Sequence, residues 1–227
     1  MLNLRNLDQL LKENLKDKIV FIRVDLNVPI KDGIILDDAR IEAVIPTIKY
    51  LLSQDSKIIL ISHFGRPKAG TFDPKASLQT VAKRIEDLLD QDVDLISEIE
   101  EVKFKSTISL LENTRFLVGE LENDEGLSKS LGSMAEVYVF DAFGTAHRKQ
   151  ASTFGAIHQA NISSAGLLLE AEIEALTRAT KSKNRPLLSI VGGSKVSTKL
   201  EVLKNLSLFS DYIITGGGIT NTFLKAK

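Results

Sequence analysis

The sequence predicts an α/β protein in which a parallel β-sheet carries helices on both faces. Three observations favour this fold. Several apolar runs are hydrophobic at consecutive positions, as in strands that are buried on both faces. Segments with helical spacing lie between the runs. Each run also ends abruptly in a polar cluster. The clearest runs are Ile19–Val24, Lys57–Ile61, Ile108–Leu111 and Val137–Phe140.

The first half of the chain can be interpreted element by element. Residues 1–17 form an amphipathic opening in which charged residues alternate with apolar ones. A loop with a small β excursion follows the first strand, because Asp32-Gly33 is a turn signal. Asp37 or Asp38 is expected to cap the next helix, whose apolar positions have helical spacing. Pro46 should kink this helix or bend its start.

The pattern continues beyond the second strand, Lys57–Ile61. A loop rich in Gly and Pro precedes a helix with one apolar face between Leu78 and Leu89. A short strand near Val93–Leu95 comes next, followed by the strand that ends at Leu111. Residues 123–134 are expected to form a helix before the fourth strand.

A domain boundary is expected between residues 167 and 186, where a strong helix-forming segment ends in Pro186. The predicted domains are residues 1–166, a helix and linker over 167–185, and a second α/β unit over 186–227. In this unit, the strands Leu187–Val191 and Tyr212–Thr215 each lead into a glycine turn. Two strands do not form an independently stable sheet, so the second domain is expected to be incomplete.

Composition excludes several classes of function. A net charge of −1 argues against a broad electrostatic surface for nucleic acid or membrane lipids. The chain has no cysteine and three histidines without metal-ligand spacing, so no metal site is expected. No apolar stretch reaches the roughly 20 residues that cross a bilayer. A cytoplasmic, enzyme-like protein is therefore expected.

Arginines and a histidine collect where the predicted strands end. Open α/β sheets bind ligands beyond the carboxyl ends of their strands, and guanidinium groups bind phosphate and carboxylate bidentately. A small, highly anionic ligand such as a phosphorylated carboxylic acid is therefore predicted. Any one of these arginines alone could be a solvated surface charge, and Asp25 could be the partner of an arginine instead of a ligand contact. Arg23, inside a strand, is expected to be structural. The candidates are Asp25, Asn27, Arg40, His63, Arg66, Arg115 and Arg148.

A second candidate cluster is GGSKVSTK, Gly192–Lys199. Glycines let a backbone approach a phosphate, and a following helix N-terminus adds a favourable dipole. The same letters also occur as an ordinary turn. Lys195 and Lys199, four residues apart on one expected helical face, favour the phosphate interpretation. The spacing matches neither a Walker A loop nor, at Gly216–Gly218, a dinucleotide motif.

Six motifs occur in the order found in phosphoglycerate kinases, and the chain resembles that family from its first residue to its last. They are RVDLNVP (23–29), SHFGRP (62–67), ENTRF (112–116), DAFGTAHRKQAST (141–153), GGSKVSTK (192–199) and GGGITNTF (216–223). The resemblance implies a Rossmann-like three-layer amino-terminal domain and the start of a nucleotide domain. It also implies reversible phosphoryl transfer between 1,3-bisphosphoglycerate and ADP in glycolysis, by an enzyme that is a monomer at full length.

The resemblance also implies roles for individual residues. The seven residues at the strand ends, from Asp25 to Arg148, would hold 3-phosphoglycerate. Arg40 and Lys195 would be the catalytic cations. Mg-ADP or Mg-ATP would lie against Gly193, Lys195, Lys199, Gly217 and Gly218.

The family's Mg-positioning loop and ribose-binding glutamate do not occur in this sequence. The 227 residues are therefore expected to bind substrate without completing the reaction. A non-catalytic interaction module derived from the same fold is the alternative.

Overall fold

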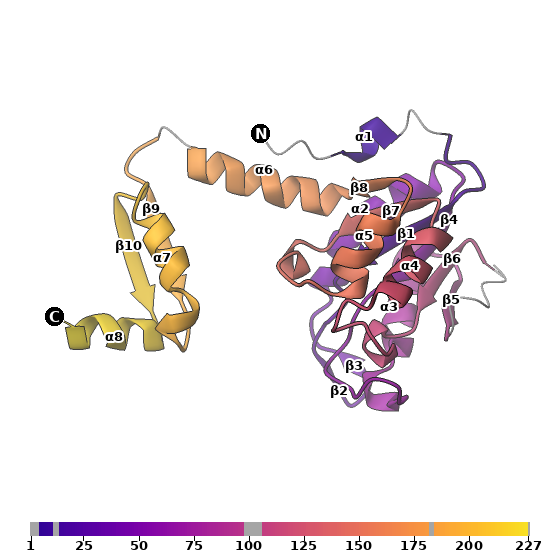
Figure 1. Ribbon diagram of the computed structural model, residues 1–227, viewed down its shortest axis with the longest axis horizontal. Coiled ribbons are helices and arrows are strands. Elements are labelled where there is room, and N and C mark those ends of the chain that lie inside the picture. The colour runs from indigo at the N-terminus through magenta and orange to yellow at the C-terminus, as the bar shows by residue number, and fades with distance from the viewer. Residues whose placement is uncertain (1–4, 11–13, 98–105, 182–183, 227) are drawn as a thin grey trace. The chain divides into compact units, whose positions relative to one another are not determined.

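The computed structural model describes residues 5–10, 14–97, 106–181 and 184–226 (Figure 1). The chain divides into two compact units, residues 1–172 and 173–227. The division falls within helix α6 (Leu167–Lys181), inside the segment predicted as an interdomain helix and linker.

The first unit is built on a six-stranded sheet with the order β5-β6-β4-β1-β7-β8, in which every pair of neighbours is parallel. The predicted parallel sheet is therefore confirmed. In sheet order the strands are β5 (Val93–Ile96), β6 (Ile108–Leu111), β4 (Lys57–Ile61), β1 (Ile19–Val24), β7 (Val137–Asp141) and β8 (Ser163–Ala165). The strand β8 is too short and too polar to follow from apolar patterning.

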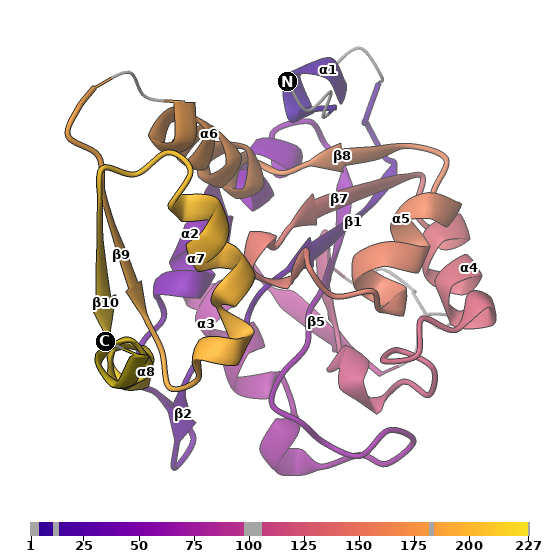
Figure 2. The same ribbon diagram turned by 60° about the vertical axis from the view of Figure 1, so that its left-hand side comes forward.

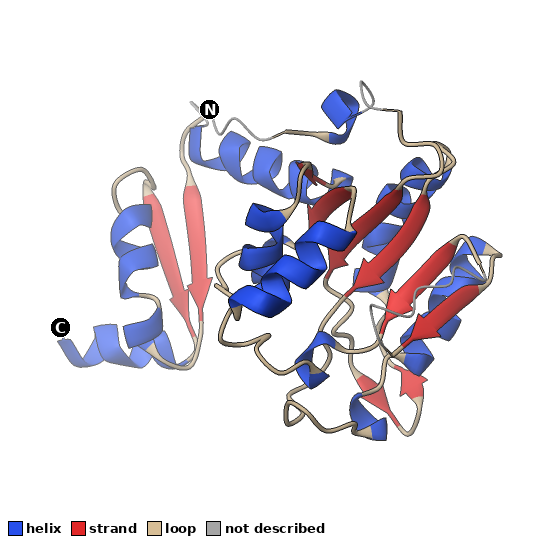
Figure 3. Ribbon diagram, turned by 45° about the vertical axis from the view of Figure 1, so that its right-hand side comes forward, coloured by secondary structure: helices blue, strands red, loops and turns tan. Residues whose placement is uncertain are grey.

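Helices cover both faces of this sheet, as Figures 2 and 3 show. Val20 and Ile22 of β1 pack into a core with α2 (Ala39–Leu52) and α3 (Gln79–Leu89). Phe21, between them, points to the opposite core, which contains residues of α4 (Glu125–Met134) and α5 (Ala156–Gln159). Successive strand residues alternate between faces, so two buried faces require an apolar residue at every position.

Several local predictions can be compared with the structure. The β excursion exists as a short antiparallel pair, β2 (Ile30–Lys31) and β3 (Ile34–Ile35). The amphipathic opening contains a four-residue helix, α1 (Leu7–Leu10), whose two leucines are buried. Pro46 lies on the exposed side of α2, which continues past it to Leu52.

The capping of α2 is divided between two neighbouring aspartates. Asp38 occupies the N-cap position, but its side chain accepts no hydrogen bond from the helix. Its carboxylate instead pairs with Arg84 of α3, at 2.6 Å. The Asp37 carboxylate accepts the amide of Ala39, at 2.9 Å, and thereby satisfies one of the free donors of the first turn.

The remaining elements of the first unit are short helical turns. Within the described residues of this unit, three 3₁₀ turns and one π-helical turn follow strands or precede helices, and the sequence patterns indicated none of them. They are η1 (Pro74–Ala76), η3 (Thr114–Phe116), η4 (Phe143–Thr145) and the π-helical η5 (Ala151–Gly155).

The second unit contains two parallel strands, β9 (Leu188–Gly192) and β10 (Tyr212–Gly216), as predicted. A small core of Val191, Leu203 and Ile219 joins them to the helices. The helical elements are η6 (Val196–Thr198), α7 (Leu200–Leu206) and α8 (Gly218–Ala226).

Candidate functional site

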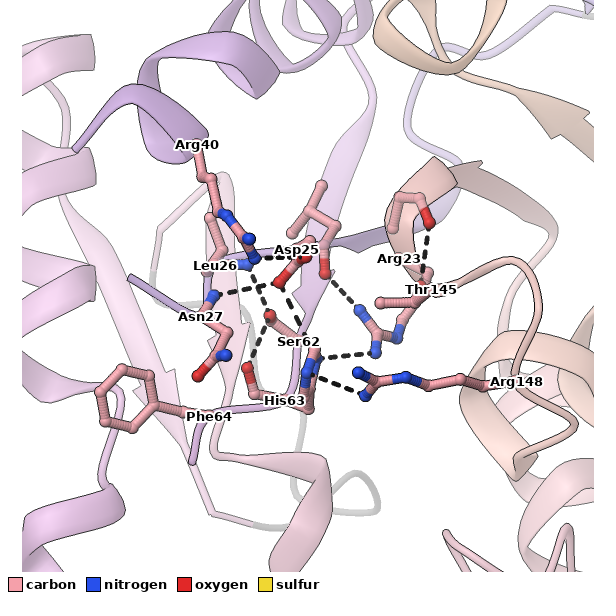
Figure 4. A network of polar contacts seen from close by, with 12 residues as sticks. Arg23, Asp25, Leu26, Asn27, Arg40, Ser62, His63, Phe64, Thr145 and Arg148 are labelled. Carbon is pink, nitrogen blue, oxygen red and sulfur yellow. Dashed lines mark hydrogen bonds and ion pairs between the residues drawn. The ribbon is translucent and has the colours of Figure 1, made fainter. Parts of the chain in front are cut away.

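The central strand β1 creates a crevice at the carboxyl edge of the sheet. The next strand of this sheet along the chain, β4, lies on one side of β1, and the later strand β7 lies on the other side. Connections that diverge from one strand open a crevice at its carboxyl end, where α/β sheets bind ligands. Asp25 and Asn27 follow β1, His63 follows β4, and Arg148 lies beyond β7 (Figure 4).

Two neighbouring pockets contain all seven predicted residues. The first has a volume of about 280 Å³ and contains no acidic residue; it is lined by Asn27, His63, Gly65, Arg66, Arg115 and Arg148. The second also has a volume of about 280 Å³, and its lining includes Asp25 and Arg40. The structure therefore brings together residues from five separate loops or helix ends. We call the first pocket the arginine pocket.

Asp25 connects the two pockets through its carboxylate. One oxygen pairs with the Arg40 guanidinium, at 2.7 Å, and the other accepts the backbone amide of Asn27, at 3.2 Å. The interpretation of Asp25 as an arginine partner therefore agrees with the structure. Asp25 retains 20% side-chain exposure and lines the second pocket, so it also remains available to a ligand.

Hydrogen bonds from backbone amides to side-chain oxygens fix the loops that present these side chains. The Ser62 hydroxyl accepts the amide of Leu26, and the Asn27 side-chain oxygen accepts the amide of Gly65, both at 2.9 Å. These two bonds join the loop after β1 to the loop after β4. A site whose loops are cross-linked in this way is held rigid before any ligand arrives.

Asn113 likewise joins the loop after β4 to the loop after β6. Sequence reasoning did not identify this residue. Its side-chain oxygen accepts the amides of Phe64 and Arg115, and its nitrogen donates to the carbonyl of Phe64. The buried amide therefore places Arg115 relative to the loop that carries Arg66. An asparagine directly after a strand and before a helical turn is the signal that could have indicated it.

Positive charge predominates around Arg115, whose pKa is lowered by burial and by Arg148, Arg23 and Arg66, and raised by the carboxylate of Glu120. Within the described part of the chain, no carboxylate lies within ion-pairing distance of Arg66, Arg115 or Arg148. Burial and the neighbouring Arg148 lower the pKa of Arg115, and the Arg115 Nε has no hydrogen-bond partner. Buried donors without partners are costly, so the pocket favours a ligand that supplies negatively charged acceptors.

His63 lies at the base of this pocket and is 3% exposed. Burial, together with the charge of Arg23, lowers its pKa to about 3, against the opposing effect of Asp25. His63 is therefore neutral at pH 7 and contributes a hydrogen bond instead of a charge.

Arg23 is fully buried and makes only internal contacts, in agreement with its predicted structural role. It donates to the Ser152 hydroxyl at 2.9 Å and to the carbonyl of Val24, and a third nitrogen lies 3.3 Å from His63. Glu120 and Ser152, which complete this buried network, were not found from the sequence. No motif with chemical meaning contains Glu120.

The depressed pKa of His63 predicts an acid-sensitive first unit. The unfolded chain takes up a proton near pH 6.5 but the folded chain only near pH 3, so stability is lost as the pH falls between these values. Between pH 7 and pH 5, His63 should account for about 2 kcal/mol of lost unfolding free energy. Urea unfolding followed by circular dichroism at both pH values checks this.

His63→Gln is the matched variant for that measurement, because it keeps a neutral polar side chain. The loss of stability between pH 7 and pH 5 should be smaller in the variant by the same amount. Equal losses in the two proteins would contradict the assignment of a neutral, buried His63.

In the second unit, the structure gives the predicted glycines a packing role. A Cβ at Gly218 would lie 2.3 Å from the backbone oxygen of Ser194, and one at Gly217 would lie 2.9 Å from that of Gly193. Gly217 also has a φ of +63°, which favours glycine. The close contact between the two loops therefore explains Gly217 and Gly218 without a ligand.

The predicted placement of Lys195 and Lys199 on one helical face is wrong. Lys195 precedes the 3₁₀ turn η6, and Lys199 lies between that turn and α7, which begins at Leu200. Both lysines are exposed in the loop that follows β9. A Cβ at Gly192 would have nothing within 4 Å, so the space beside this residue is open. Among the described residues, no cluster of three or more His, Asp or Glu could hold a metal ion.

The fold and the site define a class: an α/β protein with an arginine-lined pocket at the carboxyl edge of its larger parallel sheet. Comparison with known proteins gives the family. The family model of phosphoglycerate kinase matches residues 8–227, and the chain belongs to the phosphoglycerate kinase family.

Individual relatives agree with this membership. The phosphoglycerate kinase of Francisella tularensis subsp. holarctica is 48% identical over 216 residues, which cover 94% of this chain and 55% of that protein. That of Desulfovibrio desulfuricans is 50% identical over 214 residues, with the same coverage. The solved structure of phosphoglycerate kinase from Coxiella burnetii matches with a TM-score of 0.84 and 46% identity, and covers 94% of this chain and 55% of that chain.

The chain spans about half the length of the curated relatives it matches. No helix in the described segments combines the length and apolar character that a membrane crossing requires.

Proposed function

We propose that the first unit binds 3-phosphoglycerate and that the whole protein is a phosphoglycerate kinase. The observation that carries the proposal is the arginine pocket, which places three guanidinium groups and His63 around one small volume with no carboxylate in its lining. At pH 7, 3-phosphoglycerate carries about three negative charges, from its phosphate and its carboxylate. Charge-assisted bonds to both groups would satisfy the donors that the protein leaves open.

The two pockets suggest how the ligand lies. The phosphate occupies the arginine pocket, between Arg66, Arg115 and Arg148. The uncharged hydroxyl lies near Asp25 and Asn27, which follow β1. The carboxylate extends toward Arg40, whose ion pair with Asp25 holds the guanidinium at the start of α2.

The reaction proposed for the whole protein is phosphoryl transfer between 1,3-bisphosphoglycerate and ADP, in glycolysis. The acceptor carboxylate is already ionised at neutral pH, so no general base is needed. The protein then has to position the transferred phosphoryl group and neutralise its charge, and Arg40 and Lys195 supply this. We place the reaction in the cytoplasm and the full-length protein among monomers.

Mg-ADP or Mg-ATP is the cofactor of this proposal and supplies the acceptor or donor of the phosphoryl group. Its phosphates would lie against the loops after β9 and β10, at Gly193, Lys195, Lys199, Gly217 and Gly218. The exposed lysines and the open space beside Gly192 support the proposal that a phosphate group binds there. The close packing of Gly217 and Gly218 neither supports nor opposes it.

Isothermal titration calorimetry of the 227-residue chain with 3-phosphoglycerate tests the proposal. Binding is expected to be exothermic at low salt and to weaken several-fold between 0.05 and 0.3 M salt, roughly, because ions screen the interaction. Glycerate, which lacks the phosphate, is the control ligand and should bind at least about tenfold more weakly.

Two outcomes would contradict the proposal. One is the absence of any heat of binding at millimolar 3-phosphoglycerate, which would favour a non-catalytic interaction module. The other is equal affinity for glycerate, which would remove the phosphate from the arginine pocket.

A further inference from the structure

The two ring nitrogens of His63 face two different arginines. Nδ1 lies 3.3 Å from a terminal nitrogen of Arg23, and Nε2 lies 3.2 Å from a terminal nitrogen of Arg148 (Figure 4). A guanidinium group only donates hydrogen bonds, and a neutral imidazole has one acceptor nitrogen. Only one of the two close contacts can therefore be a hydrogen bond.

Arg23 is the arginine whose position is fixed. It is fully buried, and its other nitrogens donate to the Ser152 hydroxyl and to the carbonyl of Val24. Arg148 is half-buried and lines the arginine pocket. The nitrogen that accepts must therefore be Nδ1, and the ring proton lies on Nε2. The Asp25 carboxylate, 4.0 Å from Nδ1, is too far away to accept a hydrogen bond from the other tautomer.

A buried carboxylate orients Ser152, the residue that accepts a hydrogen bond from Arg23. Glu120 is 1% exposed, and its two oxygens accept the hydroxyl of Ser152 at 2.6 Å and the amide of Ser152 at 2.9 Å. The hydroxyl proton of Ser152 is thus committed to Glu120, which leaves the hydroxyl oxygen as an acceptor for Arg23. Arg23 therefore donates in two directions: to Ser152, which itself donates to Glu120, and to Nδ1 of His63.

The charged groups around His63 come from four elements. Arg23 lies on β1, Asp25 directly after it, Arg115 in η3, and Arg148 beyond η4. Three of the four are cations, and they disfavour a second proton on the imidazole.

We propose that Glu120 and Ser152 are positioning residues that act through Arg23 to hold His63 as the neutral Nε2–H tautomer. The inference rests on the proposed function and deepens it. The groups around the proposed phosphate position, which are the guanidinium groups of Arg66, Arg115 and Arg148 and the Nε2–H of His63, then present donors only. A doubly ionised phosphate offers only acceptors and fits this lining. A singly protonated phosphate places its own O–H against a donor, so the site selects the dianion.

The tautomer can be observed without any ligand. Long-range ¹H–¹⁵N correlation of the three histidine rings in the labelled 227-residue chain distinguishes protonated from unprotonated nitrogens. The signals that vanish in His63→Gln belong to His63. At pH 7, they are expected to show an unprotonated Nδ1 and a protonated Nε2. A protonated Nδ1, or a doubly protonated ring, would overturn the proposal.

Variants test whether Glu120 and Ser152 are the cause of this tautomer. Ser152→Ala and, separately, Glu120→Gln should move the two nitrogen shifts of His63 toward each other, as the second tautomer becomes populated. Ser128→Ala is the matched control, because Ser128 is also a buried serine and its hydroxyl has no partner. Unchanged His63 shifts in both folded variants would remove Glu120 and Ser152 from the role proposed here.

Selection of the dianion is measured by the affinity for 3-phosphoglycerate between pH 5 and pH 8. Below the second phosphate pKa of about 6, affinity should fall about tenfold per pH unit, and less steeply in Ser152→Ala. A flat profile below that pH would overturn selection of the dianion. The expected ring spectrum with no binding at any pH would refute the proposed function and leave the tautomer assignment standing.

Discussion

A chain in which Arg66 and Arg148 are both replaced by alanine is expected to bind 3-phosphoglycerate at least 100-fold more weakly. Each guanidinium group makes charge-assisted hydrogen bonds worth about 1.5–3 kcal/mol, so two of them contribute roughly 3–6 kcal/mol. About 1.4 kcal/mol corresponds to tenfold in affinity, which gives a loss of about 10² to 10⁴. Calorimetry at constant ionic strength measures it.

The control removes the same number of positive charges elsewhere. Lys83→Ala together with Arg178→Ala lowers the net charge equally, and both side chains are more than two-thirds exposed, at 71% and 72%. This control should change the affinity less than about threefold, because distant surface charges are screened. Similar losses in the two double variants would mean that net charge and not the arginine pocket determines binding.

The double variant at Arg66 and Arg148 is expected to stay folded, so unfolding should not be the cause of its weaker binding. Arg66 and Arg148 both lower the pKa of Arg115, because like charges repel one another in the pocket. Removing them relieves this repulsion, so the unfolding free energy of the double variant should equal or exceed that of the parent chain. Urea unfolding of both proteins provides the check.

Gly166→Ala is expected to have the largest effect on stability. Gly166 separates β8 from α6, and a Cβ there would lie 2.3 Å from the Asp141 carboxyl carbon. That carboxylate accepts the Thr47 hydroxyl at 2.6 Å and the Leu169 amide at 2.8 Å, so it cannot move without breaking buried hydrogen bonds. Overpacking together with a lost buried bond predicts a decrease of about 3–5 kcal/mol in the unfolding free energy of the first unit.

Gly144→Ala is the matched substitution in the same unit. A Cβ at Gly144 would meet only the Asp25 carboxylate, at an ordinary distance of 3.8 Å. Its effect on the free energy of unfolding should stay within about 1 kcal/mol. Circular dichroism during urea unfolding compares the two variants. A Gly166→Ala protein within about 1 kcal/mol of the parent would show that Asp141 has room to move.

The sheet was predictable because the cause of each strand is local. A strand buried on both faces needs an apolar residue at every position, and the run Ile19–Val24 meets that need apart from Arg23. The strand β8 has no such run, because it lies at the edge of the sheet and consists of two serines and an alanine. Helix α1 has a single turn and is likewise too short for its period to be recognised.

The arginine pocket was predictable for a topological reason. Parallel strands gather their carboxyl ends at one edge, so polar residues that follow different strands meet there. What each residue contacts was not predictable. Asp25 could have faced a ligand or an arginine, and the structure pairs it with Arg40. The expected helical face of Lys195 and Lys199 failed because the turn between them is 3₁₀ and not α.

The sequence alone therefore determined which segments form the sheet, apart from β8, and which residues gather at its carboxyl edge. Only the tertiary structure decided how Arg23, Glu120 and Ser152 are linked, and which nitrogen of His63 accepts a hydrogen bond. Arg23 and Ser152 are 129 positions apart in the chain. Local patterns report burial and periodicity, but the direction of a buried hydrogen bond depends on partners that only folding brings together.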